Sequence, residues 1–308
     1  MFEIDVCRSC GHAFQNPRLT DTGLAYYYRD FYDGLGRDTW DSIFELSVAA
    51  YRARVAMLDG LRAPATWIDI GGGHGHFCRE ARRRLPGTEF WAIDRNPDLA
   101  DAVGRGWLHR TTTTPLLDFA PEHAVRFDAV SMFHYLEHTA EPKLELQAGI
   151  TLLREGGVLL IEMPNPESPF ARWYGRFWHG WLVPQHLHLM PWRNVTMLLA
   201  ENGLSVLSVE LGKANQPFDT VGALLAAAYT FLPPTRQWPW LPYTASRRSR
   251  LIGRVGLAML IPALLVAALA DRLLHVLTKR GKGGNTYRII AVRRCRQRID
   301  RQPWGEAS

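Results

Sequence analysis

Residues 69–75, with the sequence Asp-Ile-Gly-Gly-Gly-His-Gly, constrain the fold of this chain more than any other segment. The apolar residues 66–68 that precede them predict a buried strand, and residues 77–85 that follow predict a helix. Glycine suits such a turn because a residue without Cβ accepts a positive φ and lets backbone N–H groups approach a ligand. The segment therefore predicts a strand, a ligand-binding turn and a helix.

The spacing of the glycines distinguishes between two kinds of ligand. A dinucleotide-binding turn has the pattern G-x-G-x-x-G. Here Gly71, Gly73 and Gly75 give G-x-G-x-G, and His76 stands where a dinucleotide site has its last glycine. Asp69 before the turn suits a cation better than a pyrophosphate. An acid followed by G-x-G-x-G resembles the first motif of the class I S-adenosylmethionine-dependent methyltransferases, whose cofactor carries a sulfonium and an ammonium group.

A second acidic residue supports this resemblance. Residues 89–93 predict the next strand, which ends in Asp94. An acid about twenty residues after a glycine turn can accept hydrogen bonds from both hydroxyls of a ribose. The resemblance implies that Asp94 binds the cofactor ribose and that Asp69, the three glycines and Phe133 complete the cofactor site. A helix cap before Pro97 is the alternative role for Asp94.

Strands and helices alternate along the chain as in an α/β fold with a doubly wound, Rossmann-like, seven-stranded sheet. Strands are predicted at 66–70, 89–93, 107–112, 127–133, 158–163, 204–211 and 286–292, the last two forming an antiparallel pair. Further helices are predicted near 42–61, 98–103 and 143–153, with a turn at Gly156-Gly157. The methyltransferase domain is then 41–212 with 285–296, interrupted by a helical insertion at 213–284 and followed by a tail at 297–308.

The predicted strand 127–133 leads into His134-Tyr135-Leu136-Glu137-His138. Ligands of such sheets bind beyond the carboxyl ends of the strands, which places these side chains near the cofactor. The pattern resembles the small-molecule subgroup that includes the ubiquinone-biosynthesis O-methyltransferases, in which the Glu-His pair has metal or base roles. The resemblance implies that Glu137 and His138 are catalytic, with His134 matching less closely. Packing of His138 against the next helix is the alternative.

An aromatic segment at 169–189 follows the fifth predicted strand of the sheet and is expected to cover the substrate. Its Pro-x-His-Leu sequence, which contains His186, resembles the same subgroup. Methyl transfer to oxygen needs a base, because a neutral hydroxyl is a weak nucleophile. We therefore expect His186 to be the base, ahead of His138. A histidine that only holds the loop is the alternative.

Residues 1–40 are expected to form a separate unit. Cys7, Cys10 and His12 resemble the second half of a zinc ribbon, and residues 26–32 resemble a helix that covers the cofactor in relatives. A structural zinc site needs four ligands, and only one Cys-x-x-Cys pair is present. The sequence favours a knuckle without metal. If zinc does bind, Cys7 and Cys10 are the candidate ligands.

The C-terminal quarter of the chain is strongly basic. Residues 235–308 hold 15 of the 36 Lys and Arg residues but 3 of the 30 Asp and Glu residues. They include an uncharged stretch at 255–270 flanked by arginines, which is shorter than the roughly 20 residues that a membrane span needs. This pattern indicates a helix at an anionic membrane surface, with a buried lid helix or a dimer contact as alternatives.

These features predict an enzyme that transfers a methyl group from S-adenosylmethionine to a hydroxyl or amine of a small molecule, whether aromatic, sugar or lipid-linked. No specific nucleic acid is expected as a partner, because no Asn/Asp-Pro-Pro-Tyr motif follows the strand at 127–133 and no aromatic residues interleave the basic tail. The four cysteines and the absence of signal-peptide features at residues 1–5 favour the cytoplasm, with peripheral contact at the inner face of the membrane.

Two other classes of function stay open at this point. A non-catalytic protein with the same fold could dock a membrane or partner through its basic C-terminal quarter, and a nicotinamide-dependent oxidoreductase is disfavoured by His76. The sequence leaves the methyl acceptor and the oligomeric state undetermined.

Overall fold

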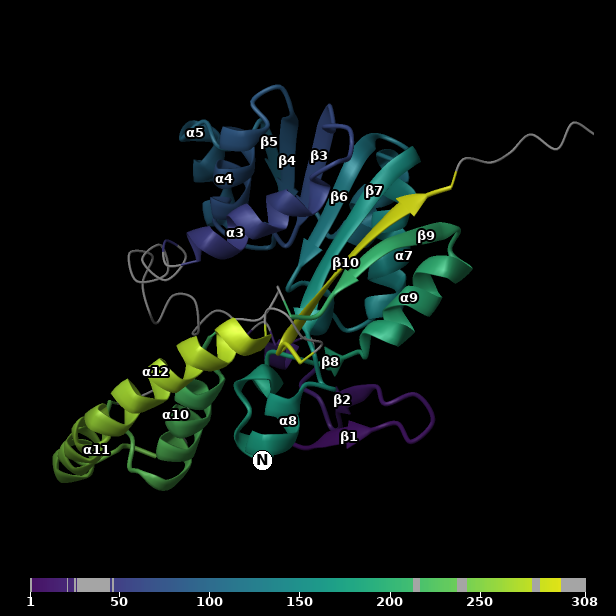
Figure 1. Cartoon of the computed structure of the whole chain (residues 1–308). Coiled ribbons are helices and arrows are strands. Elements are labelled where there is room, and N and C mark those ends of the chain that lie inside the picture. The colour runs from purple at the N-terminus through teal and green to yellow at the C-terminus, as the bar shows by residue number, and fades with distance from the viewer. Residues whose placement is uncertain are drawn as a thin grey trace, which may run out of the picture.

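A computed structural model describes residues 2–20, 22–24, 26, 45, 47–212, 217–236, 243–278 and 283–294. Its centre is a seven-stranded sheet with the order β5-β4-β3-β6-β7-β10-β9 (Figure 1). The strands are β3 (Thr66–Ile70), β4 (Glu89–Ile93), β5 (Arg110–Thr112), β6 (Phe127–Phe133), β7 (Leu153–Pro164), β9 (Leu204–Glu210) and β10 (Thr286–Arg293). β3 to β7 are parallel, and β10 is antiparallel to both of its neighbours. The predicted doubly wound sheet with its antiparallel closing pair is confirmed.

Helices cover both faces of this sheet. The parallel strands present apolar side chains to each face, and these side chains need to be buried. Trp67 of β3 lies in one hydrophobic cluster with α3 (Val48–Val55), α4 (His76–Arg84) and α5 (Asp101–Gly104). Ile68 lies in the other cluster with α6 (Leu116–Glu122), α7 (Pro142–Leu152) and α9 (Trp192–Glu201). Side chains one residue apart on a strand point to opposite faces, so β3 is buried on both.

Two predicted strands begin three or more residues away from where the structure places them. The third predicted strand, 107–112, is shortened to β5, which begins at Arg110. The expected turn at Gly156-Gly157 is wrong, because β7 begins at Leu153 directly after α7 and the two glycines form an irregularity within it. Gly156 has a φ of 74°, and the pairing of β6 with β7 shifts register between Phe127 and Ala129. The tail at 297–308 and residues 27–32 of the expected cofactor-covering helix lie outside the described residues.

A second, three-stranded sheet lies at the carboxyl edge of the first, and the sequence did not predict it. It pairs β1 (Ile4–Val6) with β2 (Ala13–Gln15), and β2 with β8 (His188–Leu189). β8 is the end of the aromatic segment 169–189, which also contains α8 (Pro169–Tyr174). The N-terminal hairpin therefore packs onto the segment that carries His186.

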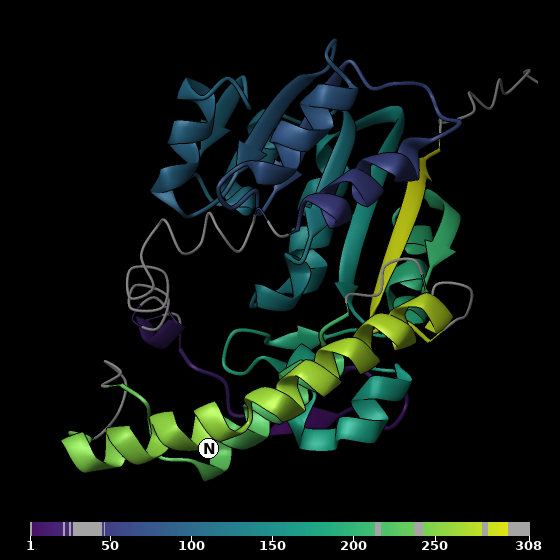
Figure 2. The same cartoon turned by 60° about the vertical axis from the view of Figure 1, so that its left-hand side comes forward.

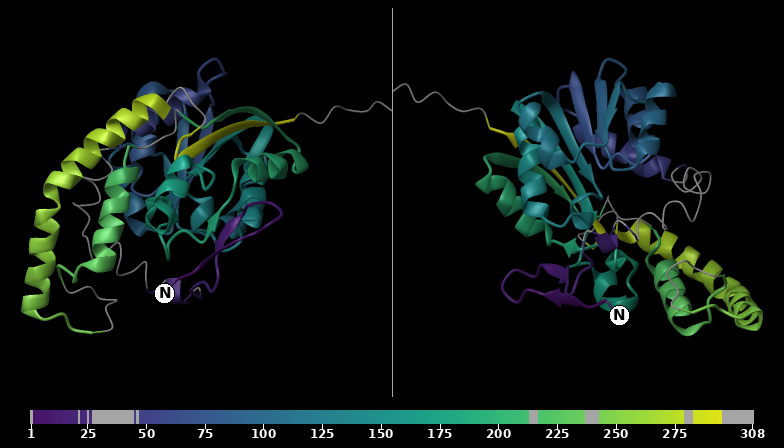
Figure 3. Two further views of the ribbon diagram at one scale, coloured as in Figure 1. Left: turned by 60° about the horizontal axis from the view of Figure 1, so that its bottom comes forward. Right: turned by 180° about the vertical axis from the view of Figure 1, so that it is seen from behind.

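The insertion before β10 is helical, and it projects from the body as an arm (Figures 2 and 3). It contains α10 (Asp219–Phe231), α11 (Arg247–Met259) and α12 (Ile261–Thr278). Figure 2 shows α11 and α12 as one long curved rod, and α10 packs beside α12.

Candidate functional site

The glycine turn has the backbone shape that its sequence predicts. Gly71, Gly73 and Gly75 have φ values of 78°, 56° and 82°, which residues with a Cβ rarely adopt. A Cβ on Gly71 would lie 2.8 Å from the ring of Tyr135, and one on Gly75 would lie 2.7 Å from the Cβ of Ala102. Glycine is required at these two positions for conformation and for space.

Asp94 lies beside this turn, at the end of β4. Its Oδ2 accepts a hydrogen bond from the Gly73 N–H at 2.7 Å, and its Oδ1 accepts one from the Asn96 N–H at 2.8 Å. Burial raises the pKa of Asp94, although these two N–H donors oppose the shift. A carboxylate has about four acceptor sites, so Asp94 keeps capacity for further donors such as ribose hydroxyls.

Asp69 lies at the carboxyl end of β3, below the turn, and is buried. The Ser131 hydroxyl donates to its Oδ1 at 2.5 Å, and the Trp67 indole N–H donates to the Ser131 hydroxyl at 2.9 Å. Burial raises the pKa of Asp69 to about 7. A cation beside this carboxyl would favour its charged form, as the predicted role requires.

Phe133 ends β6 with its ring in the core. The ring meets Phe77 at a centroid distance of 4.9 Å, and the Arg54 guanidinium lies over it at 4.8 Å. The side chain of Phe133 is therefore buried in the core, and the backbone of this residue is what lies at the carboxyl end of β6.

His134 is held by two carboxylates. Its Nδ1 lies 2.9 Å from Glu137 Oε1, and its Nε2 lies 2.9 Å from Glu162 Oε1. Burial alone would lower the pKa of His134, but these two hydrogen bonds raise it to about 9. Its φ of 52° is uncommon for a residue other than glycine. Since both ring nitrogens are engaged, we assign His134 the role of positioning Glu137 in place of the catalytic role expected from the sequence.

Glu162 is a residue that the sequence reasoning missed. It is fully buried on β7 and also pairs with Arg54 and Arg288. Burial would raise its pKa, but the two guanidinium groups hold the pKa well below its usual range. The sequence does contain a signal for this residue. Glu162 stands within the apolar run 158–163, and an acid buried there needs a buried partner.

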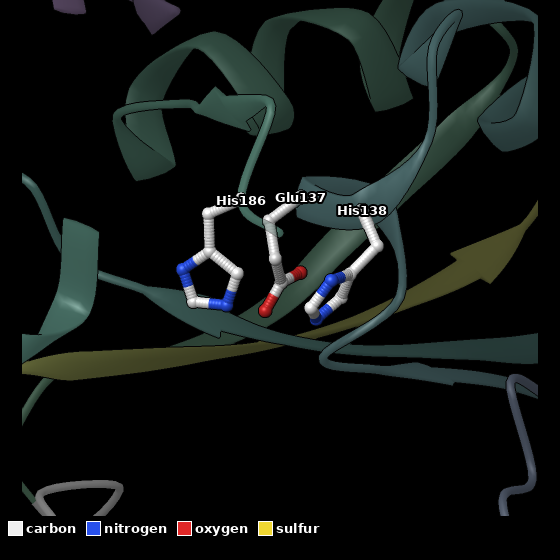
Figure 4. A group of neighbouring side chains, drawn as sticks. All are labelled: Glu137, His138 and His186. Atoms are coloured by element: carbon white, nitrogen blue, oxygen red, sulfur yellow. The ribbon is translucent and has the colours of Figure 1, made fainter. Parts of the chain in front are cut away.

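Glu137, His138 and His186 come together at the carboxyl end of the sheet (Figure 4). One ligand atom from each lies within 4.8 Å of the others, and the carboxylate lies between the two rings. Oε2 of Glu137 is buried without a hydrogen-bond partner. Among the residues that the structure describes, no other group of three metal-binding side chains is found.

The two imidazoles of this trio are neutral near pH 7, because burial lowers the pKa of His138 to about 4 and that of His186 to about 3. His186 Nδ1 lies 2.8 Å from the carbonyl oxygen of Gly180. A carbonyl only accepts hydrogen bonds, so Nδ1 carries the proton and Nε2 presents a lone pair. Neutral nitrogens with an unpaired carboxylate oxygen fit either proton transfer or a divalent cation.

The N-terminal hairpin holds the loop that carries His186. Gln15 donates from its side chain to the His186 carbonyl at 3.0 Å and from its backbone to the Leu187 carbonyl at 3.0 Å. Leu187 in turn donates to the Glu137 carbonyl at 2.7 Å. The hairpin of β1 and β2 is thus part of the scaffold of the site.

Cys7 and Cys10 lie in the loop between β1 and β2. Hydrogen bonds from Ser9 and the backbone lower the pKa of Cys7 to about 6. His12, the candidate third ligand, has its Nε2 3.1 Å from His188 Nδ1. The knuckle without metal stays a prediction from the sequence, with Cys7 and Cys10 as the candidate ligands if zinc binds.

Replacing Gly75 with alanine is expected to lower the free energy of unfolding by about 2–4 kcal/mol, because the residue has a positive φ and no room for Cβ. Gly87→Ala is the matched control, since Gly87 is exposed and a Cβ there meets nothing within 4 Å. The control is expected to change stability by less than about 0.5 kcal/mol. Urea unfolding of both variants checks this, and equal losses would contradict it.

The raised pKa of His134 predicts a pH dependence of stability. Protonated His134 stabilises the fold fully below pH 6.5, its ordinary pKa, and this contribution is lost as pH rises through about 9. The unfolding free energy, measured in urea, is expected to fall over this range. His134→Asn, which tolerates the left-handed backbone, should flatten the slope relative to the original chain. An unchanged slope in His134→Asn would count against the assignment.

Comparison with known proteins adds sequence relatives to this geometry. A family model described as a methyltransferase domain matches residues 45–209. The chain is 30% identical over 167 residues to a ubiquinone biosynthesis O-methyltransferase of Xanthomonas campestris pv. campestris, covering 49% of this chain and 66% of that protein. A protein of the same name from Xanthomonas axonopodis pv. citri is 34% identical over 111 residues, covering 33% and 44%. The chain thus spans just under two thirds of the length of the first of these relatives.

Two solved structures share the fold. A SAM-dependent methyltransferase from Archaeoglobus fulgidus superposes with a TM-score of 0.50 and 18% identity, covering 81% of this chain and 94% of that chain. The [4+2]-cyclase SpnF also superposes with a TM-score of 0.50, at 17% identity, covering 80% and 81%. Similarity at this level supports the fold alone, and the cyclase illustrates that one fold hosts different reactions.

Proposed function

Because the chain belongs to the methyltransferase-domain family, whose model matches more than half of its residues, we propose that it transfers a methyl group from S-adenosylmethionine to a hydroxyl of a small molecule. The curated relatives it resembles are O-methyltransferases. An amine acceptor is the second choice. Near neutral pH an amine loses its proton more readily than a hydroxyl does, so it has less need of a dedicated base in the site.

The observation that carries this proposal is the trio of Glu137, His138 and His186, which lies at the carboxyl edge of the sheet as the glycine turn does. The segment that contains Glu137 begins at Tyr135, whose ring packs against Gly71. A neutral imidazole with a free lone pair and an unpaired carboxylate oxygen therefore lie on the same edge as the proposed cofactor site. A hydroxyl acceptor needs a base such as this imidazole.

The chain holds the cofactor and deprotonates the acceptor. S-adenosylmethionine supplies an electrophilic methyl group on a sulfonium. Asp94 would accept hydrogen bonds from the ribose hydroxyls, the turn at Gly71–Gly75 would let the backbone approach the cofactor, and Asp69 would attract the positive end of its amino acid. Fixing both reactants in one geometry supplies much of the rate.

His186 Nε2 takes the acceptor proton as the new oxygen–carbon bond forms and the sulfur–carbon bond breaks. The attacking oxygen becomes strongly acidic as that bond forms, so a base with a pKa of about 3 suffices. The positive charge of the sulfonium ends on the imidazole, where the unpaired Oε2 of Glu137 stabilises it. His134 keeps the other oxygen of Glu137 in place.

The same trio fits a divalent cation, because two neutral imidazoles and an unpaired carboxylate oxygen lie within 4.8 Å of one another. The resemblance to the ubiquinone subgroup implies a metal or base role for the Glu137–His138 pair. A cation held there would lower the pKa of the acceptor hydroxyl. The non-catalytic alternative is not favoured, since it gives no reason for an unpaired buried carboxylate oxygen beside two neutral histidines.

Incubation with methyl-labelled S-adenosylmethionine and a fractionated cell lysate tests the proposal. The lysate is divided by ultrafiltration into metabolites and macromolecules, and label is expected in an extractable product of the metabolite fraction. Label found only in protein or nucleic acid would contradict a small-molecule acceptor. Label in neither fraction, from a sample that binds the cofactor, would favour the non-catalytic alternative.

A further inference from the structure

The outer side of the helical arm is a continuous apolar surface. Large apolar side chains there are 63–77% exposed: Met259, Val266 and, at intervals of four residues, Leu265, Leu269, Leu273 and Leu277. Isolated exposed apolar residues are ordinary, but a row along two successive helices marks an interaction surface. We name this row the apolar stripe of α11 and α12.

The opposite side of α12 is tied to the protein. The buried carboxylate of Asp271 accepts from the N–H groups of Thr220 and Val221, at 2.8 and 3.0 Å, in the first turn of α10. α10 begins at Asp219, which accepts from the indole N–H of Trp178 at 3.0 Å and from the side chain of Asn285 at 2.7 Å. The arm is therefore anchored on the aromatic segment of the site, with its stripe facing outward.

The charges around the stripe have one sign. Residues 243–278 contain a single acid, Asp271, which is buried against α10. Arginines lie at positions 247, 248, 250, 254 and 272, and all but Arg250 are exposed. Exposed aromatic residues accompany them near the end of α10 and before α11, namely Tyr229, Phe231 and Tyr243.

We propose that α11 and α12 dock the protein on an anionic lipid bilayer, with both helices lying in the plane of the interface. The apolar stripe enters the region between headgroups and acyl chains, the arginines contact lipid phosphates, and the aromatic residues lie at the headgroup level. This places the protein at the inner face of a membrane, whose cytoplasmic leaflet is anionic.

A spanning orientation fits less well. α12 is long and apolar enough to cross a membrane by composition, and its 18 residues reach about 27 Å. However, crossing would remove Asp271 from the α10 N–H groups and place a charge within hydrocarbon. A second copy of this chain is also disfavoured as the occupant, because two such surfaces would bring their arginines together without an acid to pair them.

Sedimentation of the full chain with vesicles tests the docking without measuring methyl transfer. Vesicles of phosphatidylcholine with phosphatidylglycerol are expected to bind the protein at least about tenfold more tightly than phosphatidylcholine alone. The double variant Leu265→Asp/Leu269→Asp should lose this binding. Met197→Asp/Leu207→Asp, which changes two exposed apolar residues on α9 and β9, is the matched control and should keep it.

Charge reversal tests the arginines separately. Each basic residue near an anionic surface is worth about fivefold in binding, so Arg247→Glu/Arg248→Glu should weaken it by about 25-fold or more. Unchanged binding of this variant would contradict the proposal, as would a full chain that ignores anionic vesicles. A dimer without lipid that Leu265→Asp/Leu269→Asp separates would assign the stripe to a second copy. Resistance to extraction at high pH would indicate a span.

Discussion

His186→Gln is expected to lower kcat by about 10²–10⁴-fold and to leave the affinity for S-adenosylmethionine unchanged. The lone pair of His186 Nε2 is the proposed proton acceptor, and glutamine fills a similar volume without a basic nitrogen. Nδ1 of His186 is hydrogen-bonded to the Gly180 carbonyl and fixes the ring, so Nδ1 cannot take the place of Nε2 as the base. Steady-state kinetics with the identified acceptor measures the loss.

His123→Gln is the matched control for this result. His123 stacks on Phe119 in the layer of α6 with a centroid distance of 3.8 Å, and its replacement should change kcat by less than about twofold. A His186→Gln enzyme with normal kcat, beside an inactive His138→Gln enzyme, would transfer the base role to His138. Loss of cofactor affinity in His186→Gln would indicate a structural role.

Asp94→Ala is expected to weaken binding of S-adenosylmethionine by about 100-fold. Two hydrogen bonds from ribose hydroxyls to a carboxylate contribute about 1.5 kcal/mol each or more, which corresponds to that factor. The substitution also frees the N–H groups of Gly73 and Asn96, so the turn loses the acceptor that shapes it. Equilibrium dialysis with labelled cofactor measures the change.

Asp118→Ala provides the control for charge, because Asp118 is an exposed acid in the first turn of α6. It should bind the cofactor within about twofold of the original chain. Thermal melting shows whether Asp94→Ala is folded. A folded Asp94→Ala protein with unchanged affinity would contradict the ribose assignment.

The central sheet could be predicted because its signals are local. The glycine spacing at Gly71, Gly73 and Gly75 requires a turn of known shape, and the apolar runs around it have the length of buried strands. The position of Asp94 could be predicted because it comes one helix and one strand after the turn. The seven strands were found for this reason, although β7 begins earlier than expected.

The arrangement around the site could not be predicted in the same way, because it depends on contacts distant in sequence. β8 has two residues, too few for a periodic pattern, yet it pairs with β2 and fixes the loop of His186. His134 is held by Glu162, which reaches it from the neighbouring strand. The sequence identified His134, Glu137, His138 and His186, but only the fold separates the positioning residue from the trio.

The arm shows the opposite limit. Its composition indicated a membrane surface, but a buried lid helix would have the same residues. A membrane-surface helix and a buried lid helix differ in the direction that the stripe faces. That direction depends on Asp271, which attaches the opposite side of α12 to α10. The orientation of α12 therefore depends on a contact between Asp271 and α10 that the composition of the segment does not reveal.

The central claim is that the glycine turn and Asp94 bind S-adenosylmethionine. Calorimetric titration of the purified protein with S-adenosylmethionine, and separately with NAD, tests it most directly. We predict one site of micromolar affinity for S-adenosylmethionine and no binding of NAD. A folded protein that does not bind S-adenosylmethionine, or that binds NAD in its place, would contradict the claim.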